Sequence, residues 1–163
     1  MNEYLSEAVV LDKEGIGDLD ARVSLFTKKF GKLTAKAKSA RRIVSKLSPH
    51  LEPGNVIQAR LIEKGALHIV DALKQSRLST NPNSLYFLNR ILPDGEQDLR
   101  LWQMLLSGAF DWTRALGILG WDPSEAMCGL CATDKPHAFS VFRQEFFCSG
   151  CASKFSGSAL LYI

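Results

Sequence analysis

The 163-residue sequence has no apolar run that approaches the roughly 20 residues of a membrane-spanning helix. Its N-terminus, MNEYLSEAVV, is acidic and lacks the basic region that begins a signal peptide. There is no internal repeat and no low-complexity tract, and 46% hydrophobic with 23% charged residues is the composition of an ordinary globular protein. We therefore expect a cytoplasmic protein with no membrane partner.

The sequence also lacks the motifs of common enzymes. No Ser/His/Asp or Cys/His set is present that could make a nucleophile. Gly15 and Gly17 are not followed by the further glycine and the lysine of a phosphate-binding loop. Asp18 and Asp20 are interpreted as solvated turn residues. The histidines stand apart from any thiol or carboxylate pattern; they are His50, His68 and His137. We expect the protein not to be an enzyme.

Acidic residues are absent between Asp20 and Glu52. Nine cations lie in this stretch although the whole chain carries only +3, so the remainder carries −6, the difference between the two. A merely solvated surface usually mixes both signs. Segregated positive charge predicts a surface that binds a polyanion, of which nucleic acid is the commonest. The candidate nucleic-acid-binding residues are Arg22, Lys28, Lys29, Lys32, Lys36, Lys38, Arg41, Arg42 and Lys46.

Residues 1–75 show the period-2 pattern of short strands. A turn with two glycines over Lys13–Asp20 separates the first two, and Lys64-Gly65 is expected to join the last two as a hairpin. Five short strands in this length predict a small closed or partly open barrel. The expected strands are Ser6–Asp12, Ala21–Thr27, Lys32–Lys38, Val56–Glu63 and Leu67–Ala72.

Alternation places the lysines of the third expected strand, Lys32–Lys38, on one face, with the small residues Ala35 and Ala37 toward a crowded interior. Arg41–Pro49 is a cationic connector that extends the same patch. Phe26 and Phe30 are candidates for stacking on bases, with core packing as the alternative for at least one of them.

The pattern becomes helical after about Leu73. Three segments have apolar residues at helical spacing, and the middle one should bury a stripe of Leu101, Trp102, Leu105 and Leu106. We place the boundary in Ser76–Ser84, which gives a barrel domain over residues 1–75 and a helical domain over 76–163. The expected helices are Leu85–Leu92, Leu99–Phe110 and Trp112–Leu119.

All four cysteines fall in two CxxC pairs, Cys128–Cys131 and Cys148–Cys151, with sixteen residues between the pairs. This spacing is typical of a zinc finger in which two tight turns each supply two thiolates. We predict one structural Zn²⁺ in a finger over about residues 121–157. Four thiolates leave no open position for water, so catalytic zinc is not expected. Iron in a rubredoxin-like site, two disulfides and thiol redox chemistry are the alternatives, and His137 is an alternative ligand.

Several of these segments together are similar to the bacterial RecO recombination-mediator family. The matching pieces in the first half are Val9–Leu11, Asp18–Asp20, Leu25–Thr27, Gly31–Ala37, Lys38–Arg41 and Leu51–Pro53, where Ser39 replaces the family's usual glycine. In the second half, Leu119–Pro123 leads into the first CxxC pair, and Phe146-Phe147 precedes the second. Family members usually continue in further helices, whereas this sequence ends at Ile163, so it resembles a C-terminally abbreviated member. The contacts that the family makes through those helices stay open.

The resemblance implies an α+β chain, with an N-terminal OB-fold barrel, a small helical domain and a four-cysteine zinc finger. It implies a non-enzymatic, nucleoid-associated mediator of DNA repair and recombination that binds single- and double-stranded DNA and promotes strand annealing or recombinase loading. The implied partners are a RecR-type protein and the single-strand DNA-binding protein. The alternatives are a zinc-stabilised RNA-binding module and a protein-interaction adaptor whose basic face docks on acidic tails.

Overall fold

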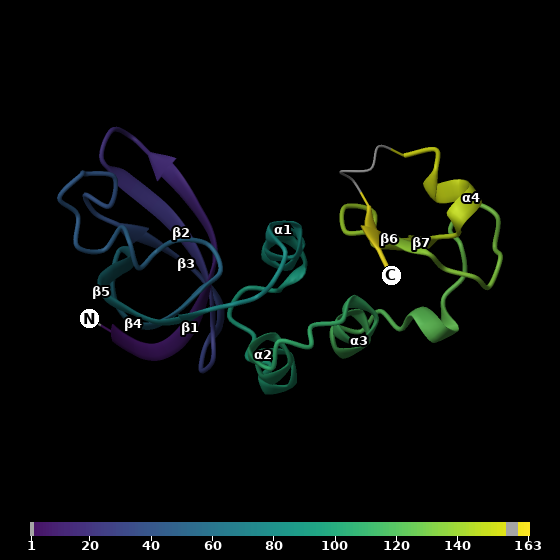
Figure 1. The fold of residues 1–163 in the computed structure, drawn as a ribbon, viewed down its shortest axis with the longest axis horizontal. Helices are drawn as coiled ribbons and strands as arrows, with labels where there is room; N and C mark the ends of the chain where they lie inside the picture. Colours follow the sequence, from purple (N-terminus) through teal and green to yellow (C-terminus); the bar gives the residue numbers. More distant parts are fainter. Residues whose placement is uncertain (1, 156–159) are drawn as a thin grey trace. The chain divides into compact units, whose positions relative to one another are not determined.

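The computed structural model of the chain describes residues 2–155 and 160–163 (Figure 1). The chain divides into two compact units, Met1–Gly108 and Ala109–Ile163. The first holds a barrel and two helices, and the second holds a short helix and the cysteine-containing segment. Strand β5 runs to Arg77, and the two helices that follow it belong to the first unit. The division into a barrel domain over residues 1–75 and a helical domain over 76–163 stays a prediction. None of the described helices is long and apolar enough to span a membrane.

Five strands form a closed barrel in the order β1-β2-β3-β5-β4. Neighbouring strands are antiparallel except β3 and β5, which pair in parallel at Lys36 and His68. The five strands predicted from the sequence are all present, including the β4–β5 hairpin around Gly65. The strands are β1 (Asn2–Ile16), β2 (Asp20–Thr27), β3 (Gly31–Ala37), β4 (Asn55–Lys64) and β5 (Ala66–Arg77).

Strand β1 is much longer than predicted. It begins at Asn2 and continues to Ile16, so most of the expected turn over Lys13–Asp20 is strand. The length allows β1 to pair with β4 through its first half and with β2 through its second half, which closes the barrel. A bulge between Val10 and Asp12 bends the strand between these two pairings.

The barrel interior is narrow and rich in alanine. Ala35 and Ala37 point inward and are almost fully buried, as the alternation predicted. Small side chains fit where five strands converge, and larger ones such as Leu25 and Ile57 fill the remaining space. The other buried residues of this core are Ala8, Val10, Ala21, Val23, Ala40, Leu51, Ala59, Leu61, Ile69 and Ala72.

The two helices of the first unit are α1 (Pro82–Ile91) and α2 (Leu99–Leu106). Helix α1 begins three residues earlier than predicted because the Asn81 side chain caps it and a proline occupies its first turn. Helix α2 ends earlier, at Leu106. Its buried face includes Met104, whereas Leu106 is exposed. The prediction that Leu106 belongs to the buried stripe is therefore wrong.

The segment between α1 and α2 runs beside the start of β3. The backbone N–H of Gly95 donates to the Lys32 carbonyl at 2.9 Å, and the Gln97 side chain donates to the Lys28 carbonyl at 2.9 Å. Gly31 has φ = 68° and lies directly under Glu96. Close packing of this segment on the β2–β3 turn explains why both helices belong to the barrel unit.

The second unit combines helix α3 (Trp112–Ile118), a 3-10 turn η1 (Pro123–Glu125) and the cysteine-containing segment. There, strands β6 (Ala138–Ser140) and β7 (Glu145–Phe147) form a hairpin, and helix α4 covers Ser149–Ala152. Strand β8 (Leu161–Tyr162) pairs with the free edge of β6, which the sequence did not reveal. The end of the finger predicted near residue 157 lies outside the described residues.

We expect Gly31→Ala to destabilise the protein by at least about 2 kcal/mol, because the left-handed backbone alone costs roughly 1–2 kcal/mol for a residue with a Cβ. The new Cβ would also lie only 2.2 Å from the carbonyl oxygen of Glu96. Thermal or urea unfolding measures the change. Gly65→Ala is the matched control, since Gly65 has φ = 72° but no heavy atom within 4 Å of the added Cβ. Equal losses for both variants would contradict the packing argument.

Candidate nucleic-acid interface and metal centre

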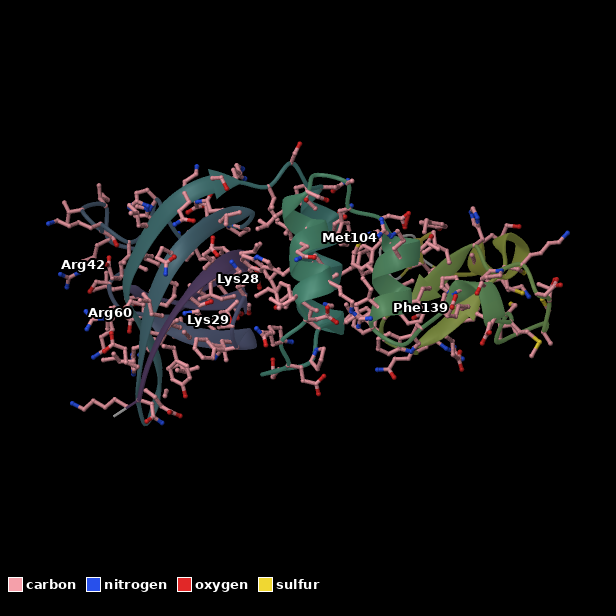
Figure 2. All side chains as sticks on the ribbon, turned by 90° about the horizontal axis from the view of Figure 1, so that it is seen from below. Lys28, Lys29, Arg42, Arg60, Met104 and Phe139 are labelled. Carbon is pink, nitrogen blue, oxygen red and sulfur yellow. The ribbon has the colours of Figure 1, made fainter. Side chains whose placement is uncertain are left out.

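The nine cations of the acid-free stretch lie at the two ends of the barrel. Strand β2 separates these ends, and its eight residues span roughly 25 Å at about 3.3 Å per residue. Figure 2 shows Lys28 and Lys29 at the end beside the helices and Arg42 at the opposite end. Lys28, Lys29 and Lys32 make up the helix-side group. The opposite end, with the β1–β2 turn and the connector after β3, is called the basic end; its cations are Arg22, Lys36, Lys38, Arg41, Arg42 and Lys46.

Two of the three helix-side lysines take part in contacts within the protein. Lys28 forms an ion pair of 2.7 Å with Glu7 of β1. The Lys32 side chain is only 13% exposed, and its ammonium lies 3.1 Å from Asp94 and donates to the Asn89 carbonyl. Lys29 is exposed and has no ion pair among the described residues. This end therefore offers little free positive charge to a partner.

At the basic end, Arg22 and Lys36 are direct cross-strand neighbours on β2 and β3. Like charges in this position repel each other. Each has an acidic partner, Glu14 at 3.5 Å from Arg22 and Asp20 at 2.9 Å from Lys36. Both acids lie outside the acid-free stretch of sequence, and strand pairing brings them alongside it.

Asp20 organises the basic end and is not the solvated turn residue expected from the sequence. It begins β2, and its carboxylate accepts the backbone N–H of Ser39 at 2.8 Å. This bond holds Ser39 in the left-handed conformation, φ = 54°, at the position where the RecO resemblance has a glycine. The Ser39 N–H and then the Lys36 ammonium hold the pKa of Asp20 below its ordinary value.

Four exposed cations of the basic end have no ion pair among the described residues. Arg42 and Lys46 lie on the connector, and Lys38 lies just before it. Arg41 is anchored instead, since its guanidinium lies against Gly15 and donates to the Gly17 carbonyl at 2.8 Å. Lys38 follows the end of β3, so it does not lie on the strand as predicted. These four cations form the candidate nucleic-acid interface.

Neither phenylalanine proposed for stacking presents a free ring. Phe26 is 1% exposed and packs against Trp102 of α2, with the ring centres 5.9 Å apart. Phe30 is half-buried and meets the Tyr4 ring edge-on at 5.1 Å. Core packing therefore holds for Phe26, which agrees with the expectation that at least one of the two packs in the core.

The four cysteines form one cluster in the second unit. Their sulfur atoms all lie within 4.8 Å of one another, and all four thiols are free. The Sγ atoms of Cys131 and Cys148 are 3.7 Å apart, well beyond the roughly 2.05 Å of a disulfide. His137 is not part of the cluster; its ring packs on Tyr162. The arrangement could hold one metal ion.

Two short backbone turns hold the sulfur atoms in place. In the first, the N–H of Ala132 donates to the Cys128 carbonyl at 2.9 Å, and Ala132 adopts a left-handed conformation with φ = 58°. The second pair lies at the start of α4, where the N–H of Ala152 donates to the Cys148 carbonyl at 2.8 Å. Cys128 and Cys151 are buried in a small core with Phe147.

The thiols of the cluster differ in acidity. The backbone N–H of Cys148, helped by those of Leu130 and Cys131, lowers the pKa of Cys128 to about 6. Burial, followed by the neighbouring Cys148 thiol, raises the pKa of Cys151 to about 12. Four thiolates this close together repel strongly unless a cation compensates them. The donor set and its backbone N–H groups therefore fit a bound metal cation.

Two comparisons with known proteins point to the same family. Residues 1–78 match the family model described as Recombination protein O N terminal. Over 185 aligned positions the chain is 29% identical to a DNA repair protein RecO from Thermodesulfovibrio yellowstonii, with 96% of this chain and 74% of the relative covered. Both findings support the RecO family, and the resemblance drawn from the sequence is confirmed.

We expect acid to weaken the first unit through Asp20. A carboxyl whose pKa is depressed by folding stabilises the protein above its unfolded pKa, near 3.8, and this stabilisation is lost as the pH falls through the lower folded value. Asp20→Asn keeps an oxygen acceptor for Ser39 but removes the charge. Urea unfolding between about pH 5 and pH 2 should show a smaller loss of stability for the variant. An unchanged pH dependence would contradict the role assigned to Asp20.

We expect Cys128→Ser to abolish metal binding by the cluster and to unfold residues from about 121 to 155. A structural metal contributes folding free energy directly, and a serine hydroxyl is a poor substitute for a thiolate. Elemental analysis measures the metal, and hydrogen exchange reports the unfolding, with the barrel strands expected to stay protected. Ser149→Ala, in the second cysteine turn, should change neither. Full protection of the finger in the metal-free variant would show that the metal is not structural.

Proposed function

We propose that this chain is a non-enzymatic DNA-binding mediator of recombinational repair. Its similarity to the RecO family supports a role in DNA repair and recombination. The observation that carries the finer proposal is a group of four exposed cations at one end of a small closed barrel, none of which has an ion pair within residues 2–155 and 160–163: Lys38, Arg41, Arg42 and Lys46. In this proposal they bind the phosphate backbone of single- and double-stranded DNA.

The barrel topology supports an OB-fold. Five strands close with a parallel β3–β5 contact, and in OB-folds the β2–β3 face and the β1–β2 and β4–β5 loops bind oligonucleotides. Here the β1–β2 turn lies beside the connector, since the N–H of Arg41 donates to the Leu19 carbonyl at 2.9 Å. The free cations therefore lie next to one of the loops that OB-folds use for binding.

Annealing follows from neutralised charge. Two complementary strands repel through their phosphates, and a cationic surface that holds both removes part of that repulsion. The same contacts would let the protein hold a strand while a recombinase is loaded. As partners we propose a RecR-type protein and the single-strand DNA-binding protein. The similarity to RecO supports this only at the coarser level of recombination proteins.

We propose that the cysteine cluster holds one structural Zn²⁺. Zinc accepts four thiolates at about 2.3 Å, which places neighbouring sulfurs about 3.8 Å apart in a tetrahedron. The 3.7 Å separation of Cys131 and Cys148 agrees with this spacing. When bound, zinc would supply a cation that compensates the thiolates and fixes the two turns. Iron in the purified protein would contradict this proposal.

Titration of labelled single-stranded DNA with the full chain at several salt concentrations tests the DNA-binding proposal. Four phosphate contacts predict a log–log slope of roughly −3, at about 0.7 per contact. Arg42→Gln/Lys46→Gln removes two free cations and breaks no ion pair of the described residues. We expect roughly tenfold weaker binding and a slope shallower by roughly 1.4.

The matched control is Lys135→Gln/Lys154→Gln, two exposed lysines of the second unit, which should change the affinity little. If the control is as harmful as the basic-end variant, the assignment of the interface to the barrel is wrong. Equal or tighter binding of a matched RNA would favour an RNA-binding module, and salt-insensitive weak binding of both would favour a protein-interaction adaptor.

A further inference from the structure

The connector after β3 carries the most exposed large apolar side chains among the described residues. The backbone N–H of Ser45 donates to the Arg42 carbonyl at 2.9 Å, so Arg42–Ser45 is a turn with Ile43 and Val44 at its corner. Their relative exposures are 105% and 84%, while the next most exposed large hydrophobic residue, Met127, reaches 63%. Corner positions usually hold glycine, proline, asparagine, aspartate or serine. Neither turn formation nor core packing therefore explains two β-branched aliphatic residues here.

The turn projects from an anchored base. Before it, the Ser39 N–H binds the Asp20 carboxylate, and the Arg41 backbone and guanidinium bind the carbonyls of Leu19 and Gly17. After it, the Lys13 ammonium of β1 donates to the Ser48 hydroxyl at 3.1 Å. These bonds fix the chain on both sides of Ile43 and Val44, which we call the tip. The two side chains are therefore held out in solvent next to the β1–β2 turn.

The charges around the tip restrict what can cover it. Arg41, Arg42 and Lys46 flank the two aliphatic residues, and the sequence has no acid from Ala21 to Leu51. A complementary partner must combine dense negative charge with apolar faces that lie between the charges. Nucleic acid has this combination, with phosphates spaced along the strand and flat base faces between them.

Unpaired bases suit the tip better than a duplex. Inserting an aliphatic side chain between stacked base pairs carries the free-energy cost of unstacking them, although architectural proteins do so with wedges of Ile, Leu or Met. In a single strand the base faces are already accessible, so the same side chains gain contact at a lower cost of unstacking.

We infer that Ile43 and Val44 form an aliphatic wedge that inserts between unpaired bases of single-stranded DNA, while Arg41, Arg42 and Lys46 hold the flanking phosphates. The inference rests on the proposed function, and it adds a way to separate neighbouring bases. A strand held in this way has its bases unstacked and available for pairing with a second strand.

The test uses the full chain and an oligonucleotide in which 2-aminopurine, whose fluorescence rises on unstacking, replaces one adenine. Ile43→Ser/Val44→Ser removes the wedge and keeps every cation. We expect roughly five- to tenfold weaker binding to single strands, loss of most of the fluorescence rise at saturation, and an unchanged salt slope, since the slope counts phosphate contacts. The thermal midpoint should change little because both side chains are largely exposed to solvent.

Leu73→Ser is the matched control, since Leu73 is 61% exposed on β5 and lies outside the connector; it should bind like the wild type. If the wild type shows no salt-dependent binding, the proposed function fails, and the inference fails with it. If the wild type binds and the double variant matches it in affinity and fluorescence, the wedge is wrong while the DNA-binding function stands. An equal loss for duplex DNA would overturn the preference for unpaired bases. If the double variant keeps DNA binding but loses a contact with a recombination protein, the tip is a protein-docking surface and the wedge is wrong.

Discussion

Closure of the barrel by strand β1 is the constraint on which the remaining features of the first unit depend. One strand of 15 residues pairs with β4 through its first half and with β2 through its second, and a bulge between the halves lets it bend. Closure leaves an interior so narrow that Ala35 and Ala37 face it. It also sends the β1–β2 and β2–β3 turns to opposite ends, so a continuous stretch of cations in sequence becomes two separate groups in space.

The same closure decides which cations are free. Strand β1 carries Glu7 and Glu14 past the basic strands, and Asp20 begins the strand beside Lys36. Acids from outside the acid-free stretch therefore pair with Lys28, Arg22 and Lys36. Positive charge without an ion pair then concentrates on the connector, where strand pairing brings no acid alongside. The proposed interface is therefore a loop held by Asp20 and Arg41, and the flat face of β3 contributes less to it.

The cysteine cluster, in contrast, could be predicted almost entirely from the spacing of its four cysteines in the sequence. A CxxC turn can hardly avoid placing two sulfurs on the same side, and the hairpin β6–β7 brings the second pair back to the first. Burial raises the pKa of Cys151, while backbone N–H groups lower that of Cys128. A bound metal cation would offset the repulsion among the four thiolates. The local nature of these turns explains why the sequence sufficed here.

The sequence by itself determined the five strands, the three main helices within a few residues, the cysteine cluster and the similarity to RecO proteins, because these depend on local periodicity, spacing and order. It also placed every cation of the interface in one segment. It could not show that β1 extends to Ile16, that Phe26 is covered by α2, or that Asp20 holds the base of the connector. Those features depend on strand register and on packing between segments far apart in the chain. Only the tertiary structure decided which charges are paired and that Ile43 and Val44 stand exposed, because exposure and pairing are properties of neighbours in space.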